Sequence, residues 1–276
     1  MKCHVDGELR PVERAVSATD RGLLYGDAAV ETVRAADGVP FAWDAHRERL
    51  DVSCDTLGIT VPADLRERVV ATLEANELSD ALVRVSITRG TTGTGLSPPP
   101  DEPRPTVLVT TEPVEPIARA GGVPAHLQTV TPRRIPDDSI PRRIQSHCRL
   151  DRVLARRELV PDADEALLRT REGTIADCAG SALLVVADDA IHVSPLPDGA
   201  VPRVMRTVAL EIARDEQIPV AVDDLTPSDV RSAAEVLLAN ARWGIRPVAT
   251  VDGIEVEPGP VTALLGRLLA DRVAAE

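Results

Sequence analysis

The sequence predicts a two-lobe protein of the mixed α/β (α+β) class. Its 276 residues are enough for two ordinary domains. Short apolar strand patterns and amphipathic helix patterns occur in both halves. Between them, EPVEPIARAGGV carries two prolines and a glycine pair without an apolar period, which is typical of a linker. We therefore expect an N-terminal α/β lobe over 1–115, a linker over 116–122 and a larger C-terminal lobe over 123–276.

The N-terminal lobe is expected to combine strands with two helices. CHVDGELR predicts a short strand and turn, and the next strand leads into a helix that begins near Asp44. A second helix is expected over about 63–76. Val83, Val85 and Ile87 alternate with polar residues, as in a half-buried strand, and PTVLVTTEP predicts a further strand.

The C-terminal lobe is expected to contain more strands than helices. A helix should begin near Arg149, with Leu150, Val153 and Leu154 on one face, and others are expected over 204–217 and from Val261. Because the strands often follow one another directly, the sheet should be mixed or antiparallel. The expected strands are 126–132, 164–170, 181–187, 190–194, 220–224, 234–240 and 247–253.

Composition limits the class of partner. With 31 basic and 44 acidic residues the formal net charge is -13, which argues against a nucleic acid or an anionic membrane as partner. The N-terminus has no apolar signal segment and no run is long enough to span a bilayer, so we expect a soluble, cytoplasmic protein. Four widely spaced cysteines without a C-x-x-C pair indicate neither a disulfide framework nor a zinc knuckle.

The charged residues also indicate a saline cytoplasm. Lys2 is the only lysine, and acidic residues are abundant. A halophile explains this pattern because counterions screen the repulsion. A GC-rich genome would equally favour arginine over lysine.

This interpretation predicts a salt-dependent stability. The melting temperature should keep rising with KCl well beyond the submolar range, because the Debye length falls from about 10 Å at 0.1 M to about 3 Å at 1 M. Thermal melting between these concentrations measures the effect. A melting temperature indifferent to salt would refute the halophile interpretation.

Four motifs occur in one order at one set of spacings: DRGLLYGDAAVETVR at 20–34, HRERL at 46–50, RLDRVLARREL at 149–159 and PVATVDG at 247–253. Together they resemble the fold-type IV pyridoxal-phosphate enzymes, which are the class IV aminotransferases (branched-chain and D-amino-acid aminotransferases) and aminodeoxychorismate lyase. RGTTGTGLS at 89–97 and the short chain resemble the lyase or D-amino-acid branch. The resemblance covers nearly the whole chain.

The resemblance implies the D-amino-acid aminotransferase-like fold, with a small α/β lobe and a larger lobe built on a barrel-like sheet. It also implies a homodimer that binds pyridoxal phosphate between the lobes. A small molecule could then occupy the interlobe cleft.

The family lysine that bonds covalently to the cofactor stands four residues before the residue that opens RLDRVLA. That position is Gln145 here. A primary amine is required because it condenses with the cofactor aldehyde and then moves the Cα proton. The amide of Gln145 can do neither, and Ser146 and His147 cannot form an aldimine, so binding of the cofactor is doubtful and no covalent link is expected.

Other expected cofactor positions have changed as well. The family glutamate that holds the pyridine nitrogen corresponds to Asp177, which is one methylene shorter, followed by Ser181 and Ala182. In the phosphate cup Arg49 is retained, and it should bind either phosphate or a carboxylate. Helix amides near Val204 could still favour an anion, but the family glycine is replaced by Arg203. The hydroxyl pairs are replaced at Met205 and at Ala241 and Arg242.

Three positions correspond to the family's substrate side. Val30 stands where an aromatic residue usually precedes ET, and Thr94 stands where an arginine is expected. Tyr25, the single tyrosine, is expected to be a core or lobe-interface residue in preference to a catalytic acid.

A different chemistry is conceivable from His147, Cys148, Asp177 and Cys178, which the family fold would bring near each other. They could bind zinc or activate a thiol. Against this, neighbouring residues of a strand point to opposite faces, and buried cysteines commonly fill space. We therefore expect no metal site.

These observations leave three functions open. The first is a catalytically impaired or non-catalytic paralogue that keeps the scaffold, and the residue changes favour it. The second is an active aminodeoxychorismate lyase or amino-acid aminotransferase. The third is a cofactor-independent enzyme that uses the same cleft.

Overall fold

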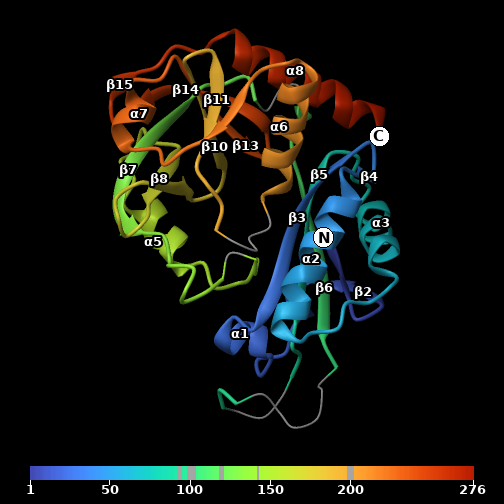
Figure 1. The fold of residues 1–276 in the computed structure, drawn as a ribbon. Coiled ribbons are helices and arrows are strands. Elements are labelled where there is room, and N and C mark those ends of the chain that lie inside the picture. The colour runs from blue at the N-terminus through green and yellow to red at the C-terminus, as the bar shows by residue number, and fades with distance from the viewer. Residues whose placement is uncertain (92–94, 98–103, 118–120, 142, 198–201) are drawn as a thin grey trace. The chain divides into compact units, whose positions relative to one another are not determined.

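A computed structural model describes the chain except for residues 92–94, 98–103, 118–120, 142 and 198–201 (Figure 1). The chain forms two compact units. Unit 1 comprises Met1–Val114, Arg142–Cys148 and Glu276, and unit 2 comprises Glu115–Pro141 and Arg149–Ala275. Residues 142–148 thus belong with unit 1, although they lie in sequence between two stretches of unit 2.

In the described part of unit 1, six antiparallel strands form one sheet in the order β2-β1-β6-β5-β3-β4. The strands predicted around Val85 and over 105–113 are confirmed. Strand β3 was not predicted as a strand, because the charged residues Glu31 and Arg34, which are buried in ion pairs, interrupt its apolar pattern. The strands are β1 (Lys2–Val5), β2 (Glu8–Pro11), β3 (Ala28–Ala36), β4 (Val39–Pro40), β5 (Ala81–Thr88) and β6 (Thr106–Pro113).

Two helices cover one face of this sheet. Leu50 of α2 and Leu73 of α3 join one buried cluster with Val33 of β3 and with Val83 and Val85 of β5. Both predicted helices are confirmed: α2 begins one residue before the predicted start, and the ends of α3 differ from the predicted ones by one or two residues. The helical segments of unit 1 are η1 (Val12–Arg14), α1 (Arg21–Tyr25), α2 (Trp43–Leu57) and α3 (Leu65–Ala75).

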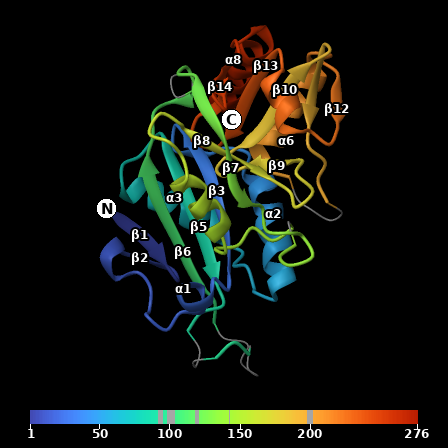
Figure 2. The same ribbon diagram turned by 90° about the vertical axis from the view of Figure 1, so that its left-hand side faces the viewer.

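Unit 2 is built on a mixed sheet that curls into a half-barrel (Figures 1 and 2). Its order is β12-β11-β10-β13-β14-β7-β8-β9, with β15 paired to β14. The pairs β11–β12, β14–β7 and β7–β8 are parallel, so of the two predicted arrangements, mixed or antiparallel, the sheet has the mixed one. The described strands are β7 (Ala125–Arg133), β8 (Glu165–Arg169), β9 (Ile175–Cys178), β10 (Ala182–Ala187), β11 (Ala190–Val193), β12 (Val220–Val222), β13 (Glu235–Asn240), β14 (Gly244–Val251) and β15 (Ile254–Glu255).

The helices of unit 2 include the three that were predicted. Helix α5 begins at Leu150, but its apolar side chains Leu150, Val153 and Leu154 are 66%, 53% and 46% exposed. No helix within the described residues is both long and apolar enough to cross a membrane. The helices are α5 (Leu150–Arg157), α6 (Val204–Asp215), α7 (Pro227–Arg231) and α8 (Pro260–Ala275).

Candidate functional site

Gln145 lies on the outer edge of β3 in unit 1. Its backbone carbonyl accepts a hydrogen bond from the Val30 amide at 2.7 Å, and its own amide donates to Ser53 Oγ of α2 at 3.0 Å. Ser146 makes an antiparallel bridge with Ala29. The backbone at position 145 is therefore fixed from both sides. Val30, expected on the substrate side, is completely buried.

The residues after Gln145, His147 and Cys148, also contact unit 1. His147 Nε2 lies 3.1 Å from Ser86 Oγ of β5. The exposed Cys148 thiol lies 3.8 Å from the carbonyl oxygens of Tyr25 and Gly26. These contacts hold the segment to the sheet and to the turn after α1.

Arg49 and His46 project from α2 toward one buried carboxylate, Glu31 of β3. Glu31 Oε2 lies 2.9 Å from His46 Nδ1, and Glu31 Oε1 lies 3.3 Å from Arg49 Nε. The three side chains are at most 8% exposed. Glu31 was missed as a partner of Arg49, although it is the E of the ET pair in the first motif. Asp27, four residues before Glu31 in the same motif, also forms ion pairs.

Within the first motif, Asp27 fixes the turn between α1 and β3. Its carboxylate lies 2.9 Å from Arg21 Nε and 2.8 Å from Arg89 Nε. Burial works to raise the pKa of Asp27, but the hydrogen bonds and charges of Arg89 and Arg21 outweigh it, so this pKa is lowered. Tyr25 is half-buried and its hydroxyl accepts from the Gly95 amide at 3.0 Å. Thr94 lies outside the described residues.

Asp177 lies on β9 of unit 2 and pairs with an arginine. Asp177 Oδ2 accepts a hydrogen bond from Arg203 Nε at 2.8 Å. Arg203 stands immediately before α6 and also donates to the carbonyl oxygens of Gly180 and Cys178, each at 3.3 Å. The carboxylate expected to hold a ring nitrogen is therefore bound to an arginine of the same unit.

A second guanidinium lies close to this pair. Arg152 Nη1 of α5 donates to the Ala179 carbonyl at 3.2 Å. Burial, followed by repulsion from Arg203, lowers the pKa of Arg152. Cys178 is completely buried, and burial raises its pKa well above the usual value. It therefore does not supply the thiolate that an activated cysteine needs.

Ser181 is buried at the start of β10 and bonds to a carboxylate that the sequence pattern did not indicate. Its hydroxyl donates to Glu165 Oε2 at 2.8 Å and accepts from Asn240 Nδ2 at 3.1 Å. Arg156 Nη2 lies 2.9 Å from Glu165 Oε1. Glu165 is fully buried although it opens the strand of apolar residues that the sequence predicted. The sequence around Glu165 gave no sign that its side chain would be buried in a hydrogen-bond network.

The expected phosphate-cup positions of unit 2 lie at a helix start and a turn. Val204 and Met205 are buried in the first turn of α6, which has no side-chain cap. Ala241 and Arg242 follow β13 in the turn to β14, where Asn240 Oδ1 accepts from the Arg242 amide at 2.9 Å. Neither Met205 nor Ala241 can donate a hydroxyl hydrogen bond.

No three His, Cys, Asp or Glu side chains within the described residues are grouped closely enough to hold a metal ion. The expected convergence of His147 and Cys148 with Asp177 and Cys178 joins residues of different units. It therefore stays a prediction.

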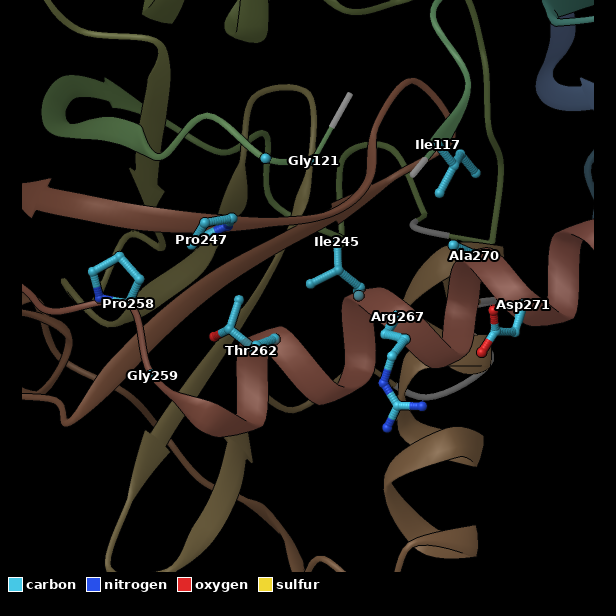
Figure 3. A pocket seen from close by; sticks show the side chains of 13 residues that line it. Ile117, Gly121, Ile245, Pro247, Pro258, Gly259, Thr262, Arg267, Ala270 and Asp271 are labelled. Atoms are coloured by element: carbon cyan, nitrogen blue, oxygen red, sulfur yellow. The ribbon is translucent and has the colours of Figure 1, made fainter. Parts of the chain in front are cut away.

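Unit 2 also has a cavity of about 450 Å³ between α8 and β14 (Figure 3). Ile117, Ile245 and Pro247 contribute to its walls, while its charged residues, Arg267 and Asp271, are exposed. The residues expected to hold a cofactor are not among its described lining residues.

The cavity predicts a stabilising substitution. A Cβ at Gly266 of α8 would come no closer than 3.9 Å to Ile245 Cβ, so Gly266→Ala should raise the free energy of unfolding by about 1 kcal/mol through helix propensity. Denaturant unfolding measures this. Gly259→Ala, one residue before α8, is the comparison: its Cβ would overlap the Glu235 side chain, so it should destabilise the protein. Equal effects of the two substitutions would contradict this packing.

The chain is similar to a defined set of proteins. The model of amino-transferase class IV matches residues 28–251. A putative branched-chain-amino-acid aminotransferase of Methanocaldococcus jannaschii is 32% identical over 258 residues, covering 92% of this chain and 88% of the relative. The solved 4-amino-4-deoxychorismate lyase of Pseudomonas aeruginosa is 29% identical, with a TM-score of 0.83 over 98% of both chains. A branched-chain aminotransferase of Thermoproteus uzoniensis, solved with norvaline, shares the fold at 24% identity, with a TM-score of 0.91 over 100% of this chain and 96% of the other.

Proposed function

The chain belongs to the class IV aminotransferase family, and from this premise we propose that it is a non-catalytic paralogue. It keeps the scaffold of the family and lacks the covalent chemistry of pyridoxal phosphate. Its function is then that of a subunit that binds a partner or a small molecule.

Gln145 is the observation that carries this proposal. Transamination and the lyase reaction of the family need a primary amine that bonds to the cofactor aldehyde, and an amide is not nucleophilic enough to do so. The backbone at position 145 is held by Val30 and Ser53, so the side chain here is a glutamine on an ordered segment.

Lys2 does not replace the missing amine. It lies on β1, and β6, β5 and β3 follow β1 in the sheet (Figure 2). The Gln145 segment pairs with β3 on the side away from β5. Four strand spacings of about 4.8 Å place the two backbones roughly 19 Å apart, which exceeds the reach of a lysine side chain.

Unit 2 adds support for the same proposal. The Asp177 carboxylate is paired with Arg203, and Met205 and Ala241 bring no hydroxyl to the expected phosphate cup. These residues do not fit a pyridoxal phosphate bound in the manner of the family.

An absorption titration tests the proposal. Adding pyridoxal phosphate to the purified chain should give the spectrum of the free cofactor, and a Lys2→Arg variant should give the same result. Residual activity is assayed in parallel with branched-chain L-amino acids, D-alanine and aminodeoxychorismate. A saturable protein-bound band retained by Lys2→Arg, together with turnover, would favour an active aminotransferase or lyase instead.

We also propose that the protein is a cytoplasmic homodimer. The exposed apolar face of α5, formed by Leu150, Val153 and Leu154, supports an association because a helix in a monomer usually turns such a face inward. Sedimentation of the unaltered chain and of a Val153→Glu variant tests this. A monomeric mass for the unaltered chain would contradict it.

A further inference from the structure

Arg203 is an unusual residue at the start of a helix. It is the N-cap of α6, where serine, threonine, aspartate, asparagine and glycine are preferred because they satisfy the free amides. Arg203 makes no side-chain cap bond there. Helix formation therefore does not account for an arginine at this position.

The side chain of Arg203 instead spans from α6 to the end of β9. Nε donates to Asp177 Oδ2 at 2.8 Å, while Nη1 and Nη2 donate to the Gly180 and Cys178 carbonyls at 3.3 Å. The Arg203 and Asp177 side chains are only 18% and 22% exposed. Burial works to lower the pKa of Arg203, but the charge and hydrogen bond of Asp177 reverse this, so the pKa is raised.

We infer that Arg203 is a built-in counter-ion that occupies the Asp177 carboxylate in place of a cofactor ring. This deepens the proposed function and rests on the family resemblance at Asp177, but it does not depend on Gln145. The Asp177 carboxylate of unit 2 therefore has its counter-ion in the protein without cofactor. The changes at positions 177 and 203 are one coupled feature.

The local charge supports this inference. Arg203 and Arg152 bring two guanidinium groups to one carboxylate, and repulsion from Arg203 already contributes to lowering the pKa of Arg152. A protonated pyridine ring would bring a third positive charge to the same place. Like charges at short range disfavour the charged form of the incoming group.

Pyridoxamine 5'-phosphate is a suitable probe, because it has no aldehyde and its binding needs no lysine. We expect the unaltered chain to bind it weakly, and Arg203→Gly to bind it about tenfold more tightly or better. Glycine is tolerated at an N-cap, so this variant should fold. Arg203→Lys, which keeps the positive charge, should stay weak, as should Arg214→Gln at the other end of α6. Equal binding by the unaltered chain and Arg203→Gly, or by Arg203→Lys and Arg203→Gly, would overturn the inference.

Thermal melting provides a second readout without ligand. Asp177→Asn should lower the melting temperature of the unaltered chain by several degrees and have less than half this effect in the Arg203→Gly background, because the pair is then already broken. Equal shifts in both backgrounds would show that the two residues are not coupled.

The binding experiment also separates this inference from the proposed function. If Arg203→Gly bound pyridoxamine 5'-phosphate more tightly only in combination with Gln145→Lys, the inference would be contradicted. A covalent adduct of pyridoxal phosphate at position 145 of the unaltered chain would instead refute the proposed function.

Discussion

Gln145→Lys alone should leave the protein without transamination or lyase turnover. The backbone at this position is fixed by Val30 and Ser53, so a lysine would be held on an ordered segment. A positioned general base contributes a factor of about 10² to 10⁴ in rate, but only when the reacting molecule is bound. Arg203 already occupies Asp177, so the restored amine would lack a firmly bound cofactor.

Activity should appear only when the cofactor-binding residues are restored together with the lysine. The decisive comparison is Gln145→Lys against a combined revertant, assayed with D- and L-amino acids and aminodeoxychorismate. Gln145→Met serves as the control for a side chain of similar length without an amine. Strong turnover from Gln145→Lys alone would show an intact cofactor site and contradict the wider loss. The revertant changes positions 145, 177, 203, 205, 241 and 242.

Glu31→Ala should destabilise unit 1 by about 3–5 kcal/mol. The substitution removes the carboxylate that lies 2.9 Å from His46 Nδ1 and 3.3 Å from Arg49 Nε, in surroundings where these side chains are 4% and 8% exposed. Breaking a buried ion pair from one side leaves a buried charge without its counter-ion. Denaturant unfolding in concentrated KCl measures the loss.

Glu31→Gln separates the charge from the shape of the side chain. It keeps a hydrogen-bond acceptor near His46 and removes the negative charge, so its loss of stability should be smaller than that of Glu31→Ala. Glu8→Ala on the exposed strand β2 is a matched control, since Glu8 pairs with Arg10 at the surface and its removal should change the stability little. A Glu31→Ala effect as small as that of Glu8→Ala would contradict the structural role of this cluster.

Local patterns predicted most of the fold because they report burial. The alternation of Val83, Val85 and Ile87 identified β5. The apolar periods gave both ends of α6 to within two residues and the start of α8 to within one. Strand β3 was not predicted, because the buried charged residues Glu31 and Arg34 interrupt its apolar pattern. The sequence did not predict that residues 142–148 belong to unit 1, because this depends on hydrogen bonds to β3 and α2, which are distant in sequence.

The candidate site was less predictable for the same reason. The motifs identified Arg49, Asp177 and Arg203 as important positions, but not their partners. Asp177 and Arg203 are 26 residues apart, and their pairing depends on the direction of a long side chain from the start of α6. Glu165 lies in an apolar strand, and nothing in its neighbours indicated the bond to Ser181.

Borohydride reduction of the unaltered chain in the presence of pyridoxal phosphate tests the central claim most directly. Peptide mass spectrometry then maps any phosphopyridoxyl group that has become permanently attached. Because Gln145 has no amine, we expect the peptide spanning 141–157 to keep its unmodified mass, with at most a weak, non-specific adduct on Lys2 or the N-terminal amine. A stoichiometric adduct on the 141–157 peptide would contradict the loss of covalent cofactor chemistry.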